Sequence, residues 1–289
     1  MDAMLTREVV KAQEAFQPFE RVEGALNRGA LVICDHAANT FPPGYGALGL
    51  PREALERHIA YDIGAAWLAR RLASRLAAPA ILSTFSRLLI DANRGADDPT
   101  LVMRISDGAL IPGNARIEAR EIERRRRLYW APYRAAIDAT VEAMQATGEP
   151  PAIISIHSFT PFWRGVARPW KVGVLWDSDP RLPEPLLAAL AEEEDLADTE
   201  IGDNEPYEGA LRGDTIDAVA TARGLSSVLI EVRQDLIADQ ESAEAWADRL
   251  ARIIAPLIAP PTARAPEDWG SRAASGRSAA RAPRAPGIK

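Results

Sequence analysis

The chain has 289 residues, of which 47% are hydrophobic and 26% are charged, a composition that excludes a fibrous or wholly disordered protein and predicts a packed fold. Its formal net charge of −7 argues against nucleic acid as the main partner, because binding a polyanion normally requires a basic surface. The single cysteine, Cys34, excludes a disulfide framework and a multi-cysteine zinc site. With no apolar run long enough to span a membrane and no signal-peptide pattern, we expect a cytoplasmic protein without a membrane partner.

Three segments with different patterns follow one another along the chain. Residues 1–24 are weakly patterned, and residues 25–261 have the alternating pattern of a single α/β domain. Residues 262–289 are rich in Ala, Arg, Pro, Gly and Ser and lack apolar periodicity, which predicts a disordered tail. These patterns do not predict the oligomeric state.

Within the central segment, short apolar runs alternate with longer amphipathic ones. The short runs predict strands at residues 30–34, 80–82, 152–156, 172–175 and 227–232. Apolar residues recur every three to four positions and predict helices at residues 63–76, 117–146, 182–193, 215–222 and 243–258. This alternation predicts an α/β fold of phosphorylase- or hydrolase-like type, with a mostly parallel or mixed sheet and helices on both faces. Ligands of such sheets bind beyond the carboxyl ends of the strands, so polar residues that follow a strand are candidates for a site.

Two of the three histidines, His36 and His157, directly follow predicted strands in the segments LVICDHAAN and AIISIHSFT. Neutral imidazole is a good zinc ligand, and a catalytic zinc ion typically has about three protein ligands and one open position. A single histidine after a strand is more often a cap or a hydrogen-bond partner, but two in equivalent positions favour a metal site.

The third ligand of such a site should be a carboxylate. Asp62 in HIAYDIGAA is the first choice, while Asp35 and His58 compete with it. Asp62 also precedes a predicted helix, where an aspartate commonly serves as the N-cap. The sequence alone does not separate these two roles.

Asn93 and Arg94 follow a strand-like run in FSRLLIDANRGADD. Arginine binds a carboxylate through two parallel hydrogen bonds, and asparagine adds an amide donor, which together indicate a small anionic substrate. The alternative is a structural turn stabilised by Asp91 and Asn93, with Arg94 in a salt bridge.

Glu231 lies in the last predicted strand, in SSVLIEVRQDLI. Burying a carboxylate is costly unless it is paired or functional, and a general base that accepts a proton from water would explain its position. The alternative is an ion pair with Arg233, which is two residues away and therefore on the same strand face.

Taken in order, the segments HAAN, DIGA, IDANR, IHSFT, GDNEPY and IEVRQDLI resemble the N-formylglutamate amidohydrolase family from about Leu31 to Ile258. The middle and last elements are also similar to zinc carboxypeptidases and aspartoacylases. Those enzymes carry a glutamate three residues after the first zinc-binding histidine, whereas position 39 here is Asn. The resemblance therefore implies that the acidic ligand comes from the DIGA segment.

The resemblance implies a metal-dependent amidohydrolase, with one zinc ion held by His36, Asp62 and His157 and with Glu231 as the general base. The implied reaction removes the formyl or another small acyl group from an acidic amino acid such as N-formyl-glutamate, in amino-acid metabolism. The groups implied to hold the substrate carboxylates and the developing oxyanion are Arg87, Asn93, Arg94, Arg168 and Arg233.

Two other functions fit parts of the same pattern. One is a deacylase or carboxypeptidase-like hydrolase of another small amide, because fold and catalytic core are shared across chemistries that differ in their pocket loops. The other is a non-catalytic amino-acid-binding protein, which would keep Asn93 and Arg94 but have no need of Glu231.

Overall fold

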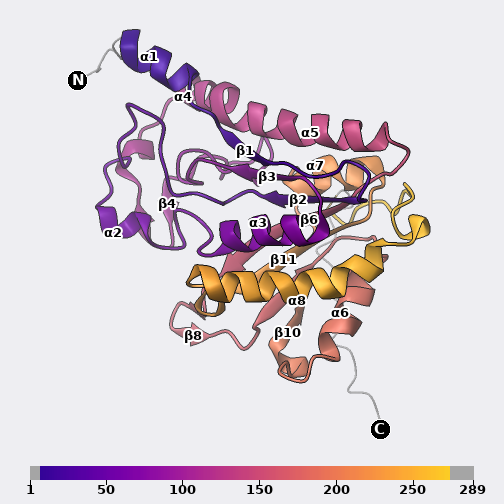
Figure 1. Ribbon diagram of the computed structural model, residues 1–289. Helices are drawn as coiled ribbons and strands as arrows, with labels where there is room; N and C mark the ends of the chain where they lie inside the picture. The colour runs from indigo at the N-terminus through magenta and orange to yellow at the C-terminus, as the bar shows by residue number, and fades with distance from the viewer. Residues whose placement is uncertain (1–6, 274–289) are drawn as a thin grey trace.

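The centre of the fold is a mixed seven-stranded sheet, seen in a computed structural model that describes residues 7–273 (Figure 1). In spatial order its strands are β1 (Phe19–Val22), β3 (Ala80–Ser83), β2 (Ala30–Cys34), β6 (Ala152–Phe159), β11 (Ser227–Arg233), β9 (Val172–Leu175) and β10 (Ile201–Asp203). Strands β3, β2, β6 and β11 are parallel neighbours, whereas β1 is antiparallel to β3 and β9 is antiparallel to β11. The carboxyl ends of the four parallel strands therefore share one edge of the sheet.

Helices cover both faces of this sheet (Figure 1). One face packs against α3 (Ala65–Leu76), α6 (Pro183–Ala191) and α8 (Gln240–Ile258). The other packs against η2 (Arg126–Trp130), a single π-helical turn, α5 (Ala131–Gln145) and α7 (Thr215–Val219). Successive strand residues point to opposite faces, so Val32 joins the first core and Leu31 and Ile33 join the second.

Short elements complete the described chain. The remaining helices are α1 (Arg7–Glu14), α2 (Arg52–Leu55), α4 (Ala119–Arg125), and the 3₁₀ turns η1 (Pro112–Asn114), η3 (Asp198–Glu200), η4 (Thr221–Arg223), η5 (Gln234–Leu236) and η6 (Pro261–Ala263). Two small hairpins pair β4 (Ile105–Ser106) with β5 (Ala109–Leu110) and β7 (Phe162–Trp163) with β8 (Val166–Ala167). Across residues 7–273, no helix combines the length and the apolar character needed to cross a membrane.

The predicted α/β class, with a mixed sheet and helices on both faces, is confirmed. Each predicted strand is present, but β6 continues to Phe159, so His157 lies within the strand rather than after it. The extension has a physical cause, because residues 157–159 pair with residues 231–233 of β11. The predicted helix at 117–146 is divided into α4, η2 and α5.

The two ends of the chain differ from the expected pattern within the described residues. Residues 7–22, expected to be weakly structured, contain α1 and β1, and β1 pairs with β3. Arg264, in the expected tail, is buried and donates hydrogen bonds to the carbonyls of Ile258 and Pro150. Such contacts between single side chains and backbone carbonyls leave no periodic signal in a sequence. Residues 274–289 of the expected tail lie outside the described residues.

Candidate active site

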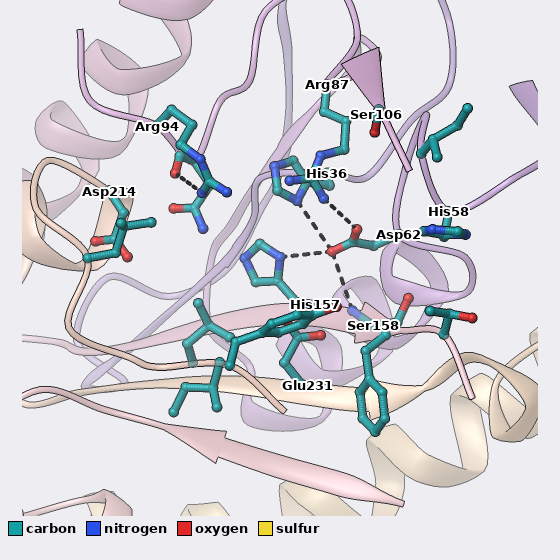
Figure 2. A pocket seen from close by; sticks show the side chains of 18 of the residues that line it. His36, His58, Asp62, Arg87, Arg94, Ser106, His157, Ser158, Asp214 and Glu231 are labelled. Atoms are coloured by element: carbon teal, nitrogen blue, oxygen red, sulfur yellow. Dashed lines mark hydrogen bonds and ion pairs between the residues drawn. The ribbon is translucent and has the colours of Figure 1, made fainter. Parts of the chain in front are cut away.

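A cavity of about 270 Å³ opens beside the carboxyl edge of the parallel strands. Its lining includes eight of the residues singled out from the sequence, namely His36, His58, Asp62, Arg87, Asn93, Arg94, His157 and Glu231. Figure 2 labels all of these side chains except Asn93 and shows the labelled ones coming from separate segments to one place. The topology explains this, because β2, β3, β6 and β11 end at the same edge.

His36, Asp62 and His157 form a compact buried group whose ligand atoms all lie within 4.8 Å of one another. Asp62 Oδ2 is 2.8 Å from Nδ1 of His157 and 3.4 Å from Nδ1 of His36 (Figure 2). The Asp62 backbone N–H donates to the His36 carbonyl at 2.9 Å, which fixes the loop before α3. The N-cap of α3 is Gly64, so the Asp62 side chain is not used as its cap. This group could hold a metal ion.

Carboxylates behind the histidines fix the orientation of both rings. Nε2 of His36 donates to Asp91 Oδ1 at 2.7 Å, and Nε2 of His157 lies 3.3 Å from Asp35 Oδ2. These contacts leave Nδ1 of each ring facing Asp62. A carboxylate on the far nitrogen of a metal-binding histidine is a common arrangement that sets both tautomer and basicity.

Asp35 is itself held by a dense set of donors. Its Oδ1 accepts from the hydroxyls of Thr215 at 2.6 Å and Tyr133 at 3.0 Å, and its Oδ2 accepts from Ser155 at 3.3 Å. The residue is only 1% exposed. Asp35 therefore acts on the site through His157, to which it presents a fully hydrogen-bonded carboxylate.

The charges in the site are strongly coupled. Burial opposes ionisation of Asp62, yet His36 and His157 lower its pKa well below the ordinary value. Burial likewise opposes the charge on His157, but hydrogen bonds to Asp35 and Asp62 raise its pKa. Burial also opposes ionisation of Asp91, and the neighbouring Arg87 guanidinium, 2.9 Å away, holds its pKa low. The site thus favours ionised carboxylates around the imidazoles.

Glu231 is the exception among these acids. It pairs in register with His157 between β11 and β6 and is 6% exposed. Its Oε2 has no hydrogen-bond partner among residues 7–273, and burial raises its pKa to about 7. Arg233 is not its partner, because that guanidinium bonds to Asp235 at 2.8 Å at the end of the strand. A buried carboxylate with a free oxygen beside the histidines can accept a proton.

The two arginines that line the cavity, Arg87 and Arg94, differ in whether their guanidinium groups already have carboxylate partners. Arg87 bonds to Asp91 and approaches Asp62 at 3.4 Å. Arg94 donates to the Asn93 carbonyl and the Thr100 hydroxyl, and no carboxylate in the described chain pairs with it. The turn expected at this segment is partly present, since Asp91 Oδ1 accepts from the Asn93 N–H. The expected salt bridge of Arg94 is absent from residues 7–273.

Arg168 and Arg233, predicted to bind substrate, do not line the cavity. The Arg168 guanidinium lies over the rings of Phe159, Trp163 and Tyr207, at 5.0 to 5.6 Å from their centroids. Arg233 is engaged by Asp235 and by the carbonyls of residues 168–170. Both guanidinium groups are used to hold the segment that carries the β7–β8 hairpin.

The sequence indicates Asp35 only as a competing metal ligand and Asp91 only as a turn residue, and it does not predict their contacts to the histidines. Asp35 and Asp91 stand in the segments DHAAN and IDANR, but their contacts to His157 and His36 depend on the strand order. Asp214 also lines the cavity, and its only local signal is its position before a predicted helix.

An α/β sheet with a buried group of two histidines and a carboxylate at its carboxyl edge fits a protein of the hydrolase class. Residues 29–238 match the model of the N-formylglutamate amidohydrolase family, and the chain belongs to this family. The resemblance found in the sequence is thereby confirmed, and membership of the family supports an amidohydrolase activity.

Two solved structures are similar to this chain. A gene product of Agrobacterium tumefaciens is 32% identical with a TM-score of 0.79, and the match covers 86% of this chain and 96% of that one. The N-formylglutamate amidohydrolase of Ralstonia eutropha JMP134 is 20% identical with a TM-score of 0.62, and the match covers 84% of this chain and 96% of that one. The second likeness supports the fold. The search of curated proteins found no match.

Proposed function

We propose that the protein is a zinc-dependent amidohydrolase that removes the formyl or another small acyl group from an acidic amino acid such as N-formyl-glutamate. The observation that carries the proposal is the pairing of Glu231, with its free buried oxygen, against His157 of the His36–Asp62–His157 group. An amino-acid-binding protein without catalysis would not need a buried carboxylate in that position. Membership of the family supports the choice of substrate.

The residues present fit a zinc ion. His36, Asp62 and His157 offer two imidazole nitrogens and a carboxylate oxygen, a donor set typical of catalytic zinc. Asp91 and Asp35 occupy the outer nitrogens of the two rings, as the carboxylate partners of zinc-binding histidines do. When bound, zinc supplies a Lewis acid that polarises the acyl carbonyl and makes a water molecule acidic near neutral pH.

Glu231 moves the proton in this reaction. It accepts a proton from the attacking water and delivers it to the amide nitrogen, so that the C–N bond breaks with an amine as the leaving group. Its raised pKa, about 7, suits a group that must both accept and return a proton near neutral pH.

The substrate is held mainly by Arg94, whose guanidinium has no carboxylate partner in the described chain. Asn93 lines the same cavity, and because its Oδ1 accepts from the Thr215 N–H at 2.9 Å, its amide Nδ2 is the group that remains to donate to the substrate. Arg87, beside Asp62, is placed to stabilise negative charge that develops on the carbonyl oxygen. Arg168 and Arg233 have no part in this proposal.

The test is hydrolysis by the purified zinc-loaded protein of N-formyl-L-glutamate, N-acetyl-L-glutamate and a dipeptide with C-terminal glutamate. We expect release of glutamate that is fastest from the formyl substrate and that stops when zinc is removed by a chelator. Faster turnover of the acetyl substrate or the dipeptide would reassign the protein as another deacylase or a carboxypeptidase. Binding without turnover of any substrate would refute catalysis.

A further inference from the structure

Two cavity segments that are far apart in the sequence are fastened together behind the cavity. Arg134 of α5 donates to the carbonyls of Ala92 at 3.2 Å and Asp214 at 3.1 Å. Gly213 has a φ of +76°, and a Cβ atom there would lie 2.9 Å from the Cα of Gly95. Together with the bond from Thr215 N–H to Asn93 Oδ1, these contacts fix residues 92–95 against residues 213–215.

This junction brings a cation and a carboxylate to the same cavity. Arg94 and Asp214 both line it and lie on the same side of the metal-binding group in Figure 2. They do not form an ion pair with each other, nor does Asp214 pair with any other cation in the described chain. The two charges are thus both available to a ligand.

Asp214 is in an unusual state for a carboxylate. It is 4% exposed, and one oxygen, Oδ1, accepts from the Asp217 N–H at 2.7 Å as the N-cap of α7. The other oxygen, Oδ2, has no hydrogen-bond donor within residues 7–273. Burial raises the pKa of Asp214 to about 7, as expected for a carboxylate whose charge lacks a partner. An N-cap requires only one acceptor atom, so capping leaves Oδ2 unexplained.

We propose that Asp214 is the subsite for the amine of the amino acid, which binds as an ammonium group after cleavage and through its amide N–H before it. Arg94 binds the α-carboxylate, which is attached to the same carbon atom as the amine. The inference rests on the proposed function for the reaction, in which a formamide and water give formate and an ammonium group. The oxygen of water joins the acyl carbon, the C–N bond breaks, and the nitrogen gains two protons, one from water through Glu231 and one from the formic acid produced.

The subsite is separate in space from the base. Glu231, which returns its proton to the nitrogen, is on β11 next to His157. Asp214 comes from a different wall of the cavity (Figure 2), so it can bind the ammonium group without taking part in the proton transfer. The pair of Arg94 and Asp214 therefore selects ligands with a carboxylate and an amine on one carbon.

Direct binding to the zinc-loaded protein tests this, with L-glutamate and glutarate, which lacks the amine, as probes in calorimetry. We expect the wild type to bind L-glutamate more tightly than glutarate. Asp214→Asn keeps an N-cap of similar quality and should weaken glutamate binding by roughly tenfold to a hundredfold, with glutarate binding unchanged or tighter. Asp214→Ser, a second capping residue, should behave in the same way if Asn perturbs the fold.

Asp239→Asn is the matched control, because Asp239 caps α8 through the Ser242 N–H at 2.9 Å and does not line the cavity. It should leave both affinities unchanged. The proposal is overturned if the wild type does not prefer L-glutamate, or if the Asp214 variants weaken both probes equally or neither. Failure of the proposed function would give a different result: the protein would bind glutamate through Asp214 but would hydrolyse no N-formyl amino acid.

Discussion

The carboxylates behind the cavity histidines and those that face the cavity differ in how far their oxygens are satisfied. Behind the rings, Asp35 accepts from Thr215, Tyr133 and Ser155, and Asp91 accepts from Arg87 and His36. Facing the cavity, Glu231 and Asp214 are equally buried, but Glu231 has a free oxygen and Asp214 has no ion-pair partner among residues 7–273. Burial opposes ionisation in all four, but His157 lowers the pKa of Asp35, and Arg87 and His36 lower that of Asp91. For Glu231 and Asp214 burial prevails and raises the pKa to about 7.

This contrast separates the carboxylates that orient the histidine rings from those that contact the substrate or transfer a proton. A buried polar atom without a partner costs roughly 1 to 3 kcal/mol, so such atoms persist where a ligand or a proton completes them. Oε2 of Glu231 is such an atom, and Glu231 lines the cavity, whereas the carboxylates behind the rings already have their hydrogen-bond partners. Substitutions of the carboxylates behind the rings and of those that face the cavity should therefore affect different properties of the protein.

The largest effect is expected for Glu231→Gln. Glutamine keeps the size of the side chain but cannot accept the proton, so kcat should fall by about 10² to 10⁴-fold while zinc stays bound. Glu208→Gln is the control, since Glu208 lines the same cavity but bonds to Arg272 at 2.9 Å, and it should keep most of its activity. A stable, zinc-loaded and fully active Glu231→Gln protein would remove Glu231 from the mechanism.

A smaller effect is expected behind the rings, for Asp35→Asn. Loss of the charge next to Nε2 of His157 should lower zinc affinity or kcat by about 10 to 100-fold. Zinc titration and melting temperature should be measured together, with Asp138→Asn at the surface as the control. A lower melting temperature with unchanged zinc affinity and kcat would mean that Asp35 only supports the core.

Arg94→Lys should act on binding rather than on chemistry. Lysine keeps the charge but loses the planar pair of donors, so we expect KM to rise by about tenfold with a smaller change in kcat. Arg75→Lys, on a surface ion pair with Asp248, should leave both constants unchanged. If KM and kcat of Arg94→Lys match those of the wild type, Arg94 has a structural role and does not bind the substrate.

The smallest effect is a pH dependence of stability in the zinc-free protein. The pKa of Glu231 is about 7 when folded, against an ordinary 4.5, so the folded state binds more protons between these values and loses stability as pH rises through them. Glu231→Gln lacks this loss. Its melting temperature relative to the wild type should therefore increase by a few degrees between pH 5 and pH 8, and a constant difference would contradict the raised pKa.

The fold was largely predictable from the sequence because its core strands are continuous apolar runs. The strands at 30–34 and 172–175 have the predicted bounds. In contrast, β1 and β10 are short strands at the edges of the sheet with partly exposed residues, and such strands lack the continuous apolar signal. The break of the helix at 117–146 into three parts is also invisible in apolar spacing, which continues through it.

The composition of the site was predictable only where a residue has a local signal. His36 and His157 could be singled out because they stand at the ends of apolar runs, and Glu231 because it interrupts one. Asp35 and Asp91 could also be named from the sequence, but their role as partners of the rings could not be predicted, since it depends on which strands are neighbours. Arg168 is predicted to bind substrate because of the family resemblance, whereas its guanidinium lies over aromatic rings that the fold brings together.

The central claim is that His36 and His157 bind a metal with Asp62, and the zinc content of three purified proteins tests it most directly. We predict about one zinc per chain in the wild type and in His58→Ala, whose histidine lines the same cavity but lies outside the group. The double variant His36→Ala, His157→Ala should lose both zinc and activity. Stoichiometric zinc in the double variant would contradict the account, because the two histidines would then be structural.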